Sequence, residues 1–421
     1  MADRESRTAP GNAGKLQAER WDARRMRRGD VAGGVAQGFL YRPGHVLVAT
    51  DHIDHVHGQL RDVDARQIDQ GPGVLLFQVG RGVDVPSLVS AMRIPRNGLV
   101  PMVSPNHVMT GNGNIMGGPA TLAEPDSTIN LCEAEGDGPE VTVAVIDTGI
   151  ALHEGLPEDA LLRAQVEFQP ADAEELKPYP NDPNLGSEAG HGTFIAGIVR
   201  QMAPGATVAV HKVLNSDGLS DDFQLAQVLA DLSAGGRKVP QIINLSLGGY
   251  THRDVSPPGL ATALASLGDK TVVLAAAGNS GRSRPWYPAA MKGVIAVGAL
   301  QNVDGLPAPL ISNFQPERAW YSNYGPWVEA CAIGDWVSCF VYYNDPPEVL
   351  PSGVTVPARD FDGWARWSGT SFATPCVAGA IAALMRKEGI DAKKAAFRLI
   401  GKSGLKRVKG LGAVVQPPCL P

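Results

Sequence analysis

The chain has 421 residues, of which 44% are apolar and 19% charged, so it is neither disordered by composition nor a coiled coil. Its formal net charge of -6 argues against a broad nucleic-acid-binding surface, which would be basic. The 49 glycines and 33 prolines favour many tight turns and exclude a fold of long helical bundles. The length suits one large domain and a smaller one.

The sequence shows no targeting or membrane-spanning segment. The first thirty residues lack an apolar run that could form a signal-peptide core, and no stretch reaches the roughly 18 apolar residues that span a bilayer. We therefore expect a cytoplasmic protein, or a secreted one if the start is misassigned. The five cysteines are sparse and odd in number, so they do not predict a disulfide framework. They are Cys132, Cys331, Cys339, Cys376 and Cys419.

Cys331 and Cys339 could face each other across a turn and form a bond. Packed thiols fit a reducing compartment better, and we favour that interpretation.

Residues 1–34 are predicted to be a flexible lead, whose arginine cluster at residues 24–28 is a solvated helix end rather than a docking element. Residues 35–110 predict a small α+β domain with strands at 45–50, 62–68, 73–79 and 99–103. Between the last two strands, apolar residues at helical spacing define one face of a helix. These residues are Val85, Leu88, Val89 and Met92. Residues 111–135, rich in Gly, Asn and Pro, are expected to be a linker.

Three histidines follow the first of these strands. His52, His55 and His57 are interleaved with Asp51 and Asp54. Taken alone, this cluster resembles a metal site. No second ligand group with a suitable spacing lies nearby, so we favour the polar face of a helix.

From Val141 onward, short apolar segments alternate with amphipathic helices. Near-continuous apolar strands separated by such helices imply a parallel sheet that is covered on both faces. In such sheets, chemistry gathers at the carboxyl ends of the strands. We therefore expect an α/β domain over residues 136–421. Its strands are expected at 141–146, 207–214, 241–247, 271–277 and 293–299, and its helices from about residue 192, around residues 225–232 and over 261–267.

Asp147 and His191 are the first candidates for chemistry. Asp147 follows the strand 141–146 directly and precedes Thr148 and Gly149, where a carboxylate could cap a turn or act chemically. His191 lies between two glycines at the start of a helix. A lone histidine there could pack in the core or act as a base.

Ser371 stands in the motif SGTSFATP, ahead of a helix of small residues, with Pro375 in the first turn. The serine could simply be an N-cap. However, Ser368 and Thr370 supply more hydroxyl groups than one cap needs, and a helix N-terminus can also present an N–H to a developing oxyanion.

Asn279 follows the strand 271–277, where its amide could stabilise a turn or complete an oxyanion hole. In the order Asp, His, Asn, Ser, the four side chains supply an orienting acid, a base, an oxyanion donor and a nucleophile. Acyl transfer requires this set.

These motifs resemble those of the subtilisin-like serine proteases (subtilases, peptidase family S8). The shared motifs are VAVIDTG, GHGTFIAG, AAAGN and SGTSFATP, and the resemblance runs from about Val141 to Val415. It implies a three-layer fold with a mostly parallel central sheet. The preceding small domain resembles the family's inhibitory propeptide, a ferredoxin-like α+β unit. A zymogen that cuts itself between Val108 and about Ile129 is therefore expected.

The resemblance also implies a role for each catalytic candidate. Ser371 would attack the peptide carbonyl, His191 would carry the proton, and Asp147 would orient the imidazole. Asn279 and the backbone N–H of Ser371 would bind the oxyanion. The substrate would lie as an extended strand between residues 213–215 and 246–248. The implied substrate-binding residues are Val213, Leu214, Asn215, Ser246, Leu247, Gly248, Gly249, Ala276, Ala277, Gly278, Trp286 and Thr370.

Two departures from the family pattern carry further expectations. Trp286 stands where small residues commonly floor the specificity pocket, so an inward ring would make that pocket shallow. Arg282 and Arg284 lie on the same loop. We therefore hypothesise that the enzyme favours a small or acidic residue before the cut. The connection at residues 201–206 is too short for the calcium loop of many subtilases. We therefore expect no metal or other cofactor, with calcium at another place as the alternative.

The expected function is a serine endopeptidase made as a self-inhibited precursor. Its partners would be protein or peptide substrates and its own N-terminal domain, with no nucleic acid and no membrane. A catalytically silent peptide-binding module is the alternative from another class. An esterase with similar machinery fits less well, because its G-x-S-x-G motif is missing.

Overall fold

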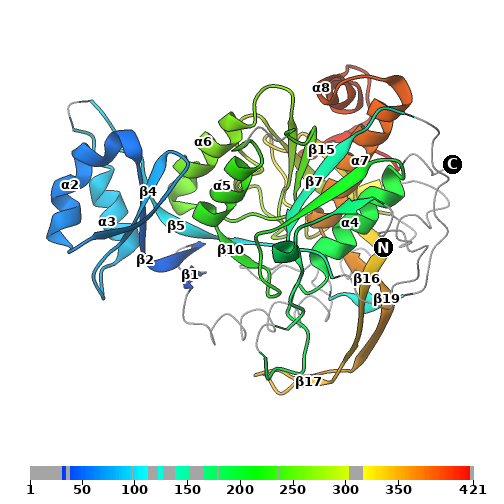
Figure 1. The fold of residues 1–421 in the computed structure, drawn as a ribbon, viewed down its shortest axis with the longest axis horizontal. Helices are drawn as coiled ribbons and strands as arrows, with labels where there is room; N and C mark the ends of the chain where they lie inside the picture. The colour runs from blue at the N-terminus through cyan, green and yellow to red at the C-terminus, as the bar shows by residue number, and fades with distance from the viewer. Residues whose placement is uncertain are drawn as a thin grey trace, which may run out of the picture.

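The computed structural model describes residues 31–34, 38–96, 98–111, 122–126, 138–151, 165–177, 180–234, 238–302 and 316–417. Cys132, Cys419 and the arginine cluster at residues 24–28 lie outside these ranges. Figure 1 shows a small body of blue and cyan elements beside a larger body of green to red ones. One strand of the small body, β5, runs into the larger body beside β10.

The small body is an antiparallel sheet with two helices. Its strands follow the spatial order β5-β2-β4-β3, and β1 (Ala32–Gly34) pairs with β2. The first core therefore forms where alternate residues of β2, such as Val46 and Val48, pack with the helices. The other elements are β2 (Phe39–Ala49), η1 (Thr50–His52), α2 (Ile53–Asp62), β3 (Arg66–Gly71), β4 (Val74–Gln78), α3 (Val85–Met92) and β5 (Val103–Thr110).

Two sequence expectations for this region meet different outcomes. The helix expected over the histidine cluster is present as α2, and His55 and His57 are exposed on it. The strand expected at 99–103 is wrong, because the strand that forms is Val103–Thr110. Its polar residues Asn106 and His107 are buried. They bond groups of the larger body, which a pattern of local hydrophobicity does not register.

Two segments at the expected boundaries are paired as strands. Ala32–Gly34, the end of the expected flexible lead, pairs with β2. Glu124–Pro125, within the expected linker, forms β6 and pairs with β19.

The larger body is built on a mostly parallel sheet, which confirms the expected α/β fold. Its ten described strands follow the order β20-β21-β15-β13-β12-β11-β7-β9-β8, and β14 pairs with β13. All neighbours along the order are parallel except β20 and β21. The strands are β7 (Thr142–Asp147), β8 (Val166–Glu167), β9 (Thr207–Lys212), β11 (Ile242–Leu245), β12 (Val272–Ala276), β13 (Val294–Asn302), β14 (Pro316–Arg318), β15 (Ala330–Ile333), β20 (Arg407–Val408) and β21 (Gly412–Val414).

Helices cover both faces of this sheet. Along β7, Val143 and Val145 belong to the core that includes α4 and α7. Ala144 and Ile146 belong to the opposite core, with α5 and α6. This two-residue alternation places one strand between two apolar layers, which explains why its sequence is apolar throughout. The helices are α4 (His191–Met202), α5 (Asp222–Asp231), α6 (Pro258–Ser266), α7 (Thr370–Glu388) and α8 (Ala392–Ala396).

A long hairpin projects from the larger body at the bottom of Figure 1. It consists of β16 (Asp335–Asp345) and β19 (Arg359–Ser368), with β17 (Glu348–Val349) and β18 (Thr355–Val356) near its tip. The buried carboxylate of Asp345 accepts hydrogen bonds from Arg359 at 2.5 Å and from the backbone N–H of Leu185 at 2.9 Å. The hairpin is thereby fixed to the loop that leads into α4.

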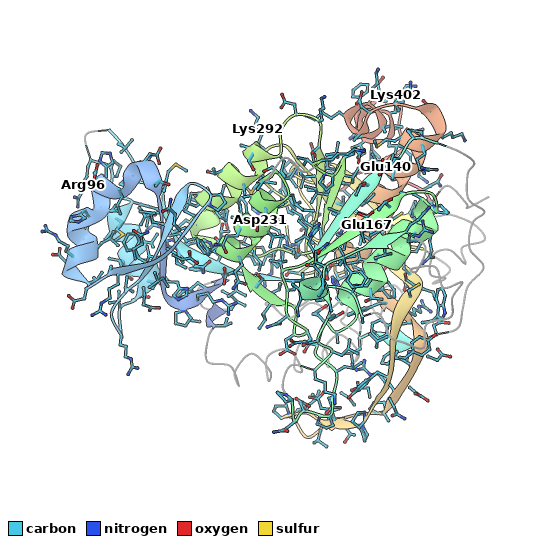
Figure 2. The ribbon with its side chains drawn as sticks, viewed as in Figure 1. Arg96, Glu140, Glu167, Asp231, Lys292 and Lys402 are labelled. Atoms are coloured by element: carbon cyan, nitrogen blue, oxygen red, sulfur yellow. The ribbon has the colours of Figure 1, made fainter. Side chains whose placement is uncertain are left out.

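Charged side chains spread over the whole molecule. Figure 2 shows Arg96 on the outer side of the small body and Lys402 near α8, at opposite ends of the view. Cys331 and Cys339 are free, buried thiols, in line with the packed-thiol interpretation. None of the helices in the described ranges is long and apolar enough to cross a membrane.

The contact between α4 and α7 depends on Gly379. A Cβ atom added there would overlap Cβ of Met202 on α4. We expect Gly379→Ala to lower the free energy of unfolding by about 1–3 kcal/mol, the usual cost of overpacking. Urea denaturation followed by circular dichroism measures the change.

The matched control is Gly58→Ala on α2, where an added Cβ meets no atom within 4 Å. It should be neutral or stabilising by about 0.5–1 kcal/mol, because alanine favours the helix over glycine. Equal effects of the two substitutions would contradict the packing argument.

Candidate active site

The predicted site residues lie at the carboxyl ends of neighbouring parallel strands. Asp147 is the last residue of β7, Ser246 follows β11 directly, and Asn279 follows β12 by three residues. Because β7, β11 and β12 are adjacent, their ends meet at one edge of the sheet. Such an edge is where open α/β sheets bind ligands.

Asp147 and His191 form a buried pair. The ring Nδ1 of His191 lies 2.7 Å from Oδ1 of Asp147, which also accepts the backbone N–H of Thr148 at 2.8 Å. Both side chains are fully buried. Nδ1 donates to the carboxylate, so Nε2 is left as the acceptor, and it has no hydrogen-bond partner among the described residues.

The surroundings of His191 act on its basicity in opposite directions. Burial lowers the pKa of His191, whereas the charge and the hydrogen bond of Asp147, together with the charge of Glu188, raise it. The net pKa lies above the ordinary value of 6.5. The ring packs against Trp367 and Phe372, with centroid distances of 5.4 and 5.3 Å. An apolar wall of this kind strengthens the attraction between the imidazolium and the carboxylate.

The first turn of α4 is held in place by the loop that follows Asp147. The N–H of Gly192 donates to Oγ1 of Thr148 at 3.0 Å, and a Cβ at Gly192 would overlap the carbonyl of Gly149. Gly190 has a φ of 81°, a conformation that favours glycine. The two glycines of the GHG motif therefore serve the approach of His191 to Asp147.

Glu174 also holds this turn and was not predicted from the sequence. Its Oε1 accepts the N–H of Gly190 at 2.9 Å, and its backbone N–H donates to the carbonyl of Ile150 at 3.0 Å. Burial raises the pKa of Glu174 well above its usual range, although the bond from Gly190 opposes this. One of several acids in a loop, it carries no motif or spacing that could have revealed it.

Ser371 lies inside the first turn of α7 and is not its N-cap. The helix begins at Thr370 with Gly369 as N-cap, so Pro375 falls beyond the first turn, contrary to expectation. Pro375 has no N–H to offer the carbonyl of Ser371 four residues earlier. The hydroxyl of Ser246 takes that role at 2.6 Å, and the hydroxyl of Ser371 donates to the carbonyl of Ser246 at 3.1 Å.

Asn279 is oriented by Thr370. Its Oδ1 accepts the backbone N–H of Thr370 at 2.9 Å and the Thr370 hydroxyl at 2.8 Å. The same hydroxyl accepts the N–H of Gly278 at 3.1 Å. With its oxygen held on this side, the amide directs its N–H groups away from Thr370. Thr370, expected among the substrate-binding residues, thus lies behind the amide and positions it.

A segment of the chain itself lies in the predicted cleft. Residues 108–110 pair antiparallel with β10 (Leu219–Asp221). On the other side, Thr110 and Gly248 exchange backbone hydrogen bonds of 2.8 and 2.9 Å, and the N–H of Gly111 donates to the carbonyl of Gly218 at 3.1 Å. An extended strand therefore lies between two edges, as expected for a substrate.

One of these two edges differs from the expectation. The segment pairs with residues 218–221 and not with residues 213–215. The N–H groups of Val213 and Leu214 both donate to the carbonyl of Asp147, at 2.8 and 3.0 Å. The side chain of Asn215 accepts the N–H groups of Asp217 and Leu219, which closes a turn. The backbone of residues 213–215 is thus occupied within the fold, although the side chain of Leu214 still lies near Gly111.

Trp286 fills the space expected for the specificity pocket. A Cβ at Gly248 would overlap Nε1 of its ring, and one at Gly278 would lie 2.9 Å from Cδ2 of the ring. The ring stands between these two walls, 3% exposed and edge-on to Tyr250 at a centroid distance of 4.8 Å. The remaining predicted wall residues, Leu247, Gly249, Ala276 and Ala277, are buried nearby on the same strand ends.

The two arginines on this loop do not line the pocket in the way we expected. Arg284 donates to Asp254 at 2.6 Å and to the carbonyl of Thr251 at 3.0 Å, and it packs on the ring of Tyr250. Arg282 is exposed. The hypothesis of an acidic preference before the cut therefore loses its physical basis, whereas the restriction to a small residue keeps it.

Glu188 is a second acid near His191 that the sequence did not reveal. Its Oε2 lies 3.9 Å from Nε2 of His191, and the side chain is fully buried. It stands three residues before His191 and two before the GHG motif. The motif identifies His191 as a candidate, but no pattern in the sequence identifies Glu188.

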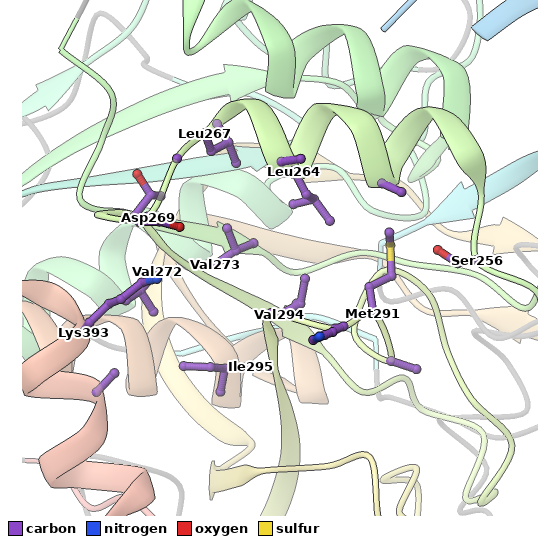
Figure 3. Close-up of a pocket in the computed structure, with 18 of the residues that line it drawn as sticks. Ser256, Leu264, Leu267, Asp269, Val272, Val273, Met291, Val294, Ile295 and Lys393 are labelled. Carbon is purple, nitrogen blue, oxygen red and sulfur yellow. The ribbon is translucent and has the colours of Figure 1, made fainter. Parts of the chain in front are cut away.

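A cavity of about 690 Å³ lies elsewhere, beside α6. Figure 3 shows Leu264, Val273 and Val294 lining it. Val294 begins β13, and Val273 is the second residue of β12. The cavity is thus at the amino ends of strands and contains none of the predicted site residues. Among the described residues, no group of three His, Cys, Asp or Glu side chains could hold a metal ion.

Comparisons with known proteins agree with this geometry. A model of the subtilase family matches residues 138–399. The chain is 30% identical over 260 residues to Alkaline elastase YaB from Bacillus sp. (strain YaB), covering 60% of this chain and 55% of the elastase. It is 32% identical over 263 residues to Subtilisin BL from Lederbergia lenta, covering 59% of this chain and 78% of that protein.

A solved structure supports the fold alone. Fervidolysin from Fervidobacterium pennivorans, a keratinolytic enzyme related to subtilisin, matches 89% of this chain and 60% of its own, with a TM-score of 0.58 and 21% identity. The family match covers the strand ends, the Asp147–His191 pair and Ser371. The chain belongs to the subtilase family.

Proposed function

We propose that this chain is a serine endopeptidase made as a self-inhibited precursor. The observation that carries the proposal is the buried 2.7 Å contact between Asp147 and His191 in a subtilase chain, with Nε2 of the imidazole left as acceptor. Ser371 lies at the start of α7, where backbone N–H groups are not used by the helix. These features supply the oriented base and the serine at a helix N-terminus that acyl transfer requires.

In the proposed reaction, the hydroxyl of Ser371 leaves the carbonyl of Ser246 and turns toward Nε2 of His191. The oxygen attacks the peptide carbonyl while His191 takes its proton, and Asp147 stabilises the imidazolium that results. His191 then gives the proton to the leaving amine. Water repeats the sequence on the acyl-enzyme and releases the acid.

The oxyanion would be bound by two donors. One is the backbone N–H of Ser371 in the first turn of α7, and the other is the side-chain amide of Asn279. The bonds from Thr370 to Oδ1 of Asn279 support this role, because they decide which end of the amide turns away from Thr370. A donor held in this way needs no rearrangement when the charge develops.

The precursor part of the proposal concerns the N-terminal domain as inhibitor. Its strand β5 continues into the cleft up to Gly111. The N-terminal end of α5 holds the domain there: Asp221 accepts from Arg42 at 3.0 Å, and Asp222 pairs with the buried His107 at 2.8 Å. Strand pairing, one ion pair and one buried hydrogen bond at one place favour a tight, competitive occupant.

We further infer that activity does not require calcium. Only residues 203–206 join α4 to β9, which leaves no room for the long loop that binds the ion in many subtilases. Activity that persists in a strong chelator would support this inference.

One observation favours a catalytically silent peptide-binding module. The hydroxyl of Ser371 donates to the carbonyl of Ser246, which is not the arrangement of an activated nucleophile. Labelling with a serine-directed phosphonate separates the two functions. The protease incorporates the label and the Ser371→Ala variant does not, whereas a silent module is unlabelled in both forms.

Self-cleavage is expected just beyond Gly111. A Cβ added to Gly111 would lie 3.6 Å from Cε1 of His191, and the next residue in the sequence is Asn112. The purified chain should therefore cut itself after Asn112, and Ser371→Ala should stay intact because it lacks the nucleophile. Intact-mass spectrometry measures both.

Ser368→Ala is the matched control, since the hydroxyl of Ser368 bonds Asp335 at 3.1 Å, outside the proposed triad. It should process like the unchanged chain. Processing that persists in Ser371→Ala would refute the assignment of the nucleophile.

The proposed pocket should open when Trp286 is truncated. We expect the unchanged enzyme to cut after small residues and Trp286→Ala to gain cleavage after Phe or Leu by roughly tenfold or more, because burying a large apolar side chain is worth about 1.5–3 kcal/mol. A peptide library that varies the residue before the cut measures this. Trp327→Ala, a partly exposed tryptophan, is the control. An unchanged enzyme that already prefers Phe would contradict the shallow pocket.

The pH profile should report the raised pKa of His191. The base must be neutral, so kcat/KM should rise with pH through an acid limb above 6.5, the ordinary value. Glu188→Gln removes a charge that raises this pKa, so its limb should lie at lower pH. Glu140→Gln, an exposed acid paired with Lys238, should leave the limb in place. If the acid limb of the pH profile stays in place in Glu188→Gln, the charge of Glu188 does not raise the pKa of His191.

A further inference from the structure

The position of Gly111 identifies one subsite of the proposed protease beside His191. The segment is fixed just before it, by the bonds between Thr110 and Gly248 on one side and by the pairing with β10 on the other. Gly111 itself donates to the carbonyl of Gly218. With cleavage after Asn112, Gly111 is the second residue before the scissile bond.

A side chain at this position would meet a carboxylate. A Cβ added to Gly111 would lie 3.6 Å from Oε2 of Glu188, 3.6 Å from Cε1 of His191 and 3.3 Å from Cδ1 of Leu214. These are ordinary or slightly tight van der Waals distances. A substrate residue here can therefore carry a side chain, and that side chain starts next to Glu188.

Glu188 is held firmly at this place. Its backbone N–H donates to the carbonyl of Ser216 at 2.8 Å, and its carbonyl accepts the N–H of His191 at 3.0 Å. A Cβ at Gly218 would overlap Cγ of Glu188. The stem of the side chain is thus confined between Gly218 and the start of α4, which leaves the carboxylate little freedom to move away from a ligand.

A second buried acid, Asp217, lies one residue before Gly218. Asp217 is 1% exposed, and its Oδ1 accepts the N–H of Ser187 at 3.2 Å. It precedes Gly218, the residue that bonds Gly111. Charges act more strongly when buried than at the surface, because water screens them less.

We propose that Glu188 is a specificity-determining residue that selects a cationic or very small side chain two positions before the scissile bond and rejects an acidic one. This rests on the proposed function, because it names the substrate class of the same cleft. A lysine or arginine would bring its charge to the carboxylate, whereas a glutamate would add a like charge, which weakens binding at an interface. Gly111 is a glycine, so the chain's own segment brings no side chain to Glu188.

The first test needs no catalysis. In the full chain with Ser371→Ala, Gly111 is replaced by Lys, by Met as an uncharged side chain of similar length, or by Glu. Each replacement is made with Glu188 intact and with Glu188→Gln. Thermal unfolding is followed for all six proteins.

With Glu188 intact, the unfolding midpoint should be highest for Gly111→Lys, intermediate for Gly111→Met and lowest for Gly111→Glu. In the Glu188→Gln series, the difference in unfolding midpoint between Gly111→Lys and Gly111→Glu should be less than half of the difference measured with Glu188 intact. Gly111→Met is the uncharged control, because it shows how far a long side chain at this position changes the midpoint without a charge. The same order and spread in both series would overturn the proposal.

The second test uses the active chain and four peptides that differ only at this position, with Gly, Lys, Met or Glu. The Lys peptide should exceed the Glu peptide in kcat/KM by roughly tenfold or more, and Glu188→Gln should reduce the ratio to a few fold. Turnover with equal rates for Lys and Glu would refute the subsite and leave the protease function standing. If no peptide is turned over, the protease function fails, and the unfolding series alone decides the subsite.

Discussion

The hydrogen bond between Asp147 and His191 is the constraint on which the rest of the structure depends. Two ionisable side chains from different elements meet at 2.7 Å with no exposure to water. Removing such groups from water is costly unless they are paired and oriented. The close contact of Gly192 with Gly149, the bond from Gly190 to Glu174 and the aromatic wall of Trp367 all hold that pairing.

The cleft follows from the same sheet that places the pair. Where the parallel strands end, backbone groups on two sides remain available to an extended chain, and residues 108–111 use them. An exposed edge of this kind invites another strand. In the proposed precursor, this strand would cover the edge and occupy the substrate position at once. The acids at the start of α5 add an ion pair with Arg42 and a buried hydrogen bond with His107, which backbone pairing alone would not supply.

In the proposed protease, neighbouring subsites would select a substrate by different physical means, as follows. Trp286 limits the first by volume, because its ring fills the space between Gly248 and Gly278. Glu188 governs the second by charge, because its carboxylate is buried and confined. The same carboxylate raises the pKa of His191. Substrate selection and the strength of the base are therefore coupled through one side chain.

The sequence by itself determined the α/β class, the strand ends and the order Asp147, His191, Asn279, Ser371, because apolar periodicity and motifs are local patterns. It did not reveal β5 with its buried Asn106 and His107, nor Glu174 and Glu188. It also misplaced the start of α7 and one edge of the cleft. These features depend on contacts between distant segments, such as that of Asn106 with Phe223 at 3.3 Å. Only the tertiary structure decides them, since the burial and partner of a polar side chain are set by elements far away in the chain.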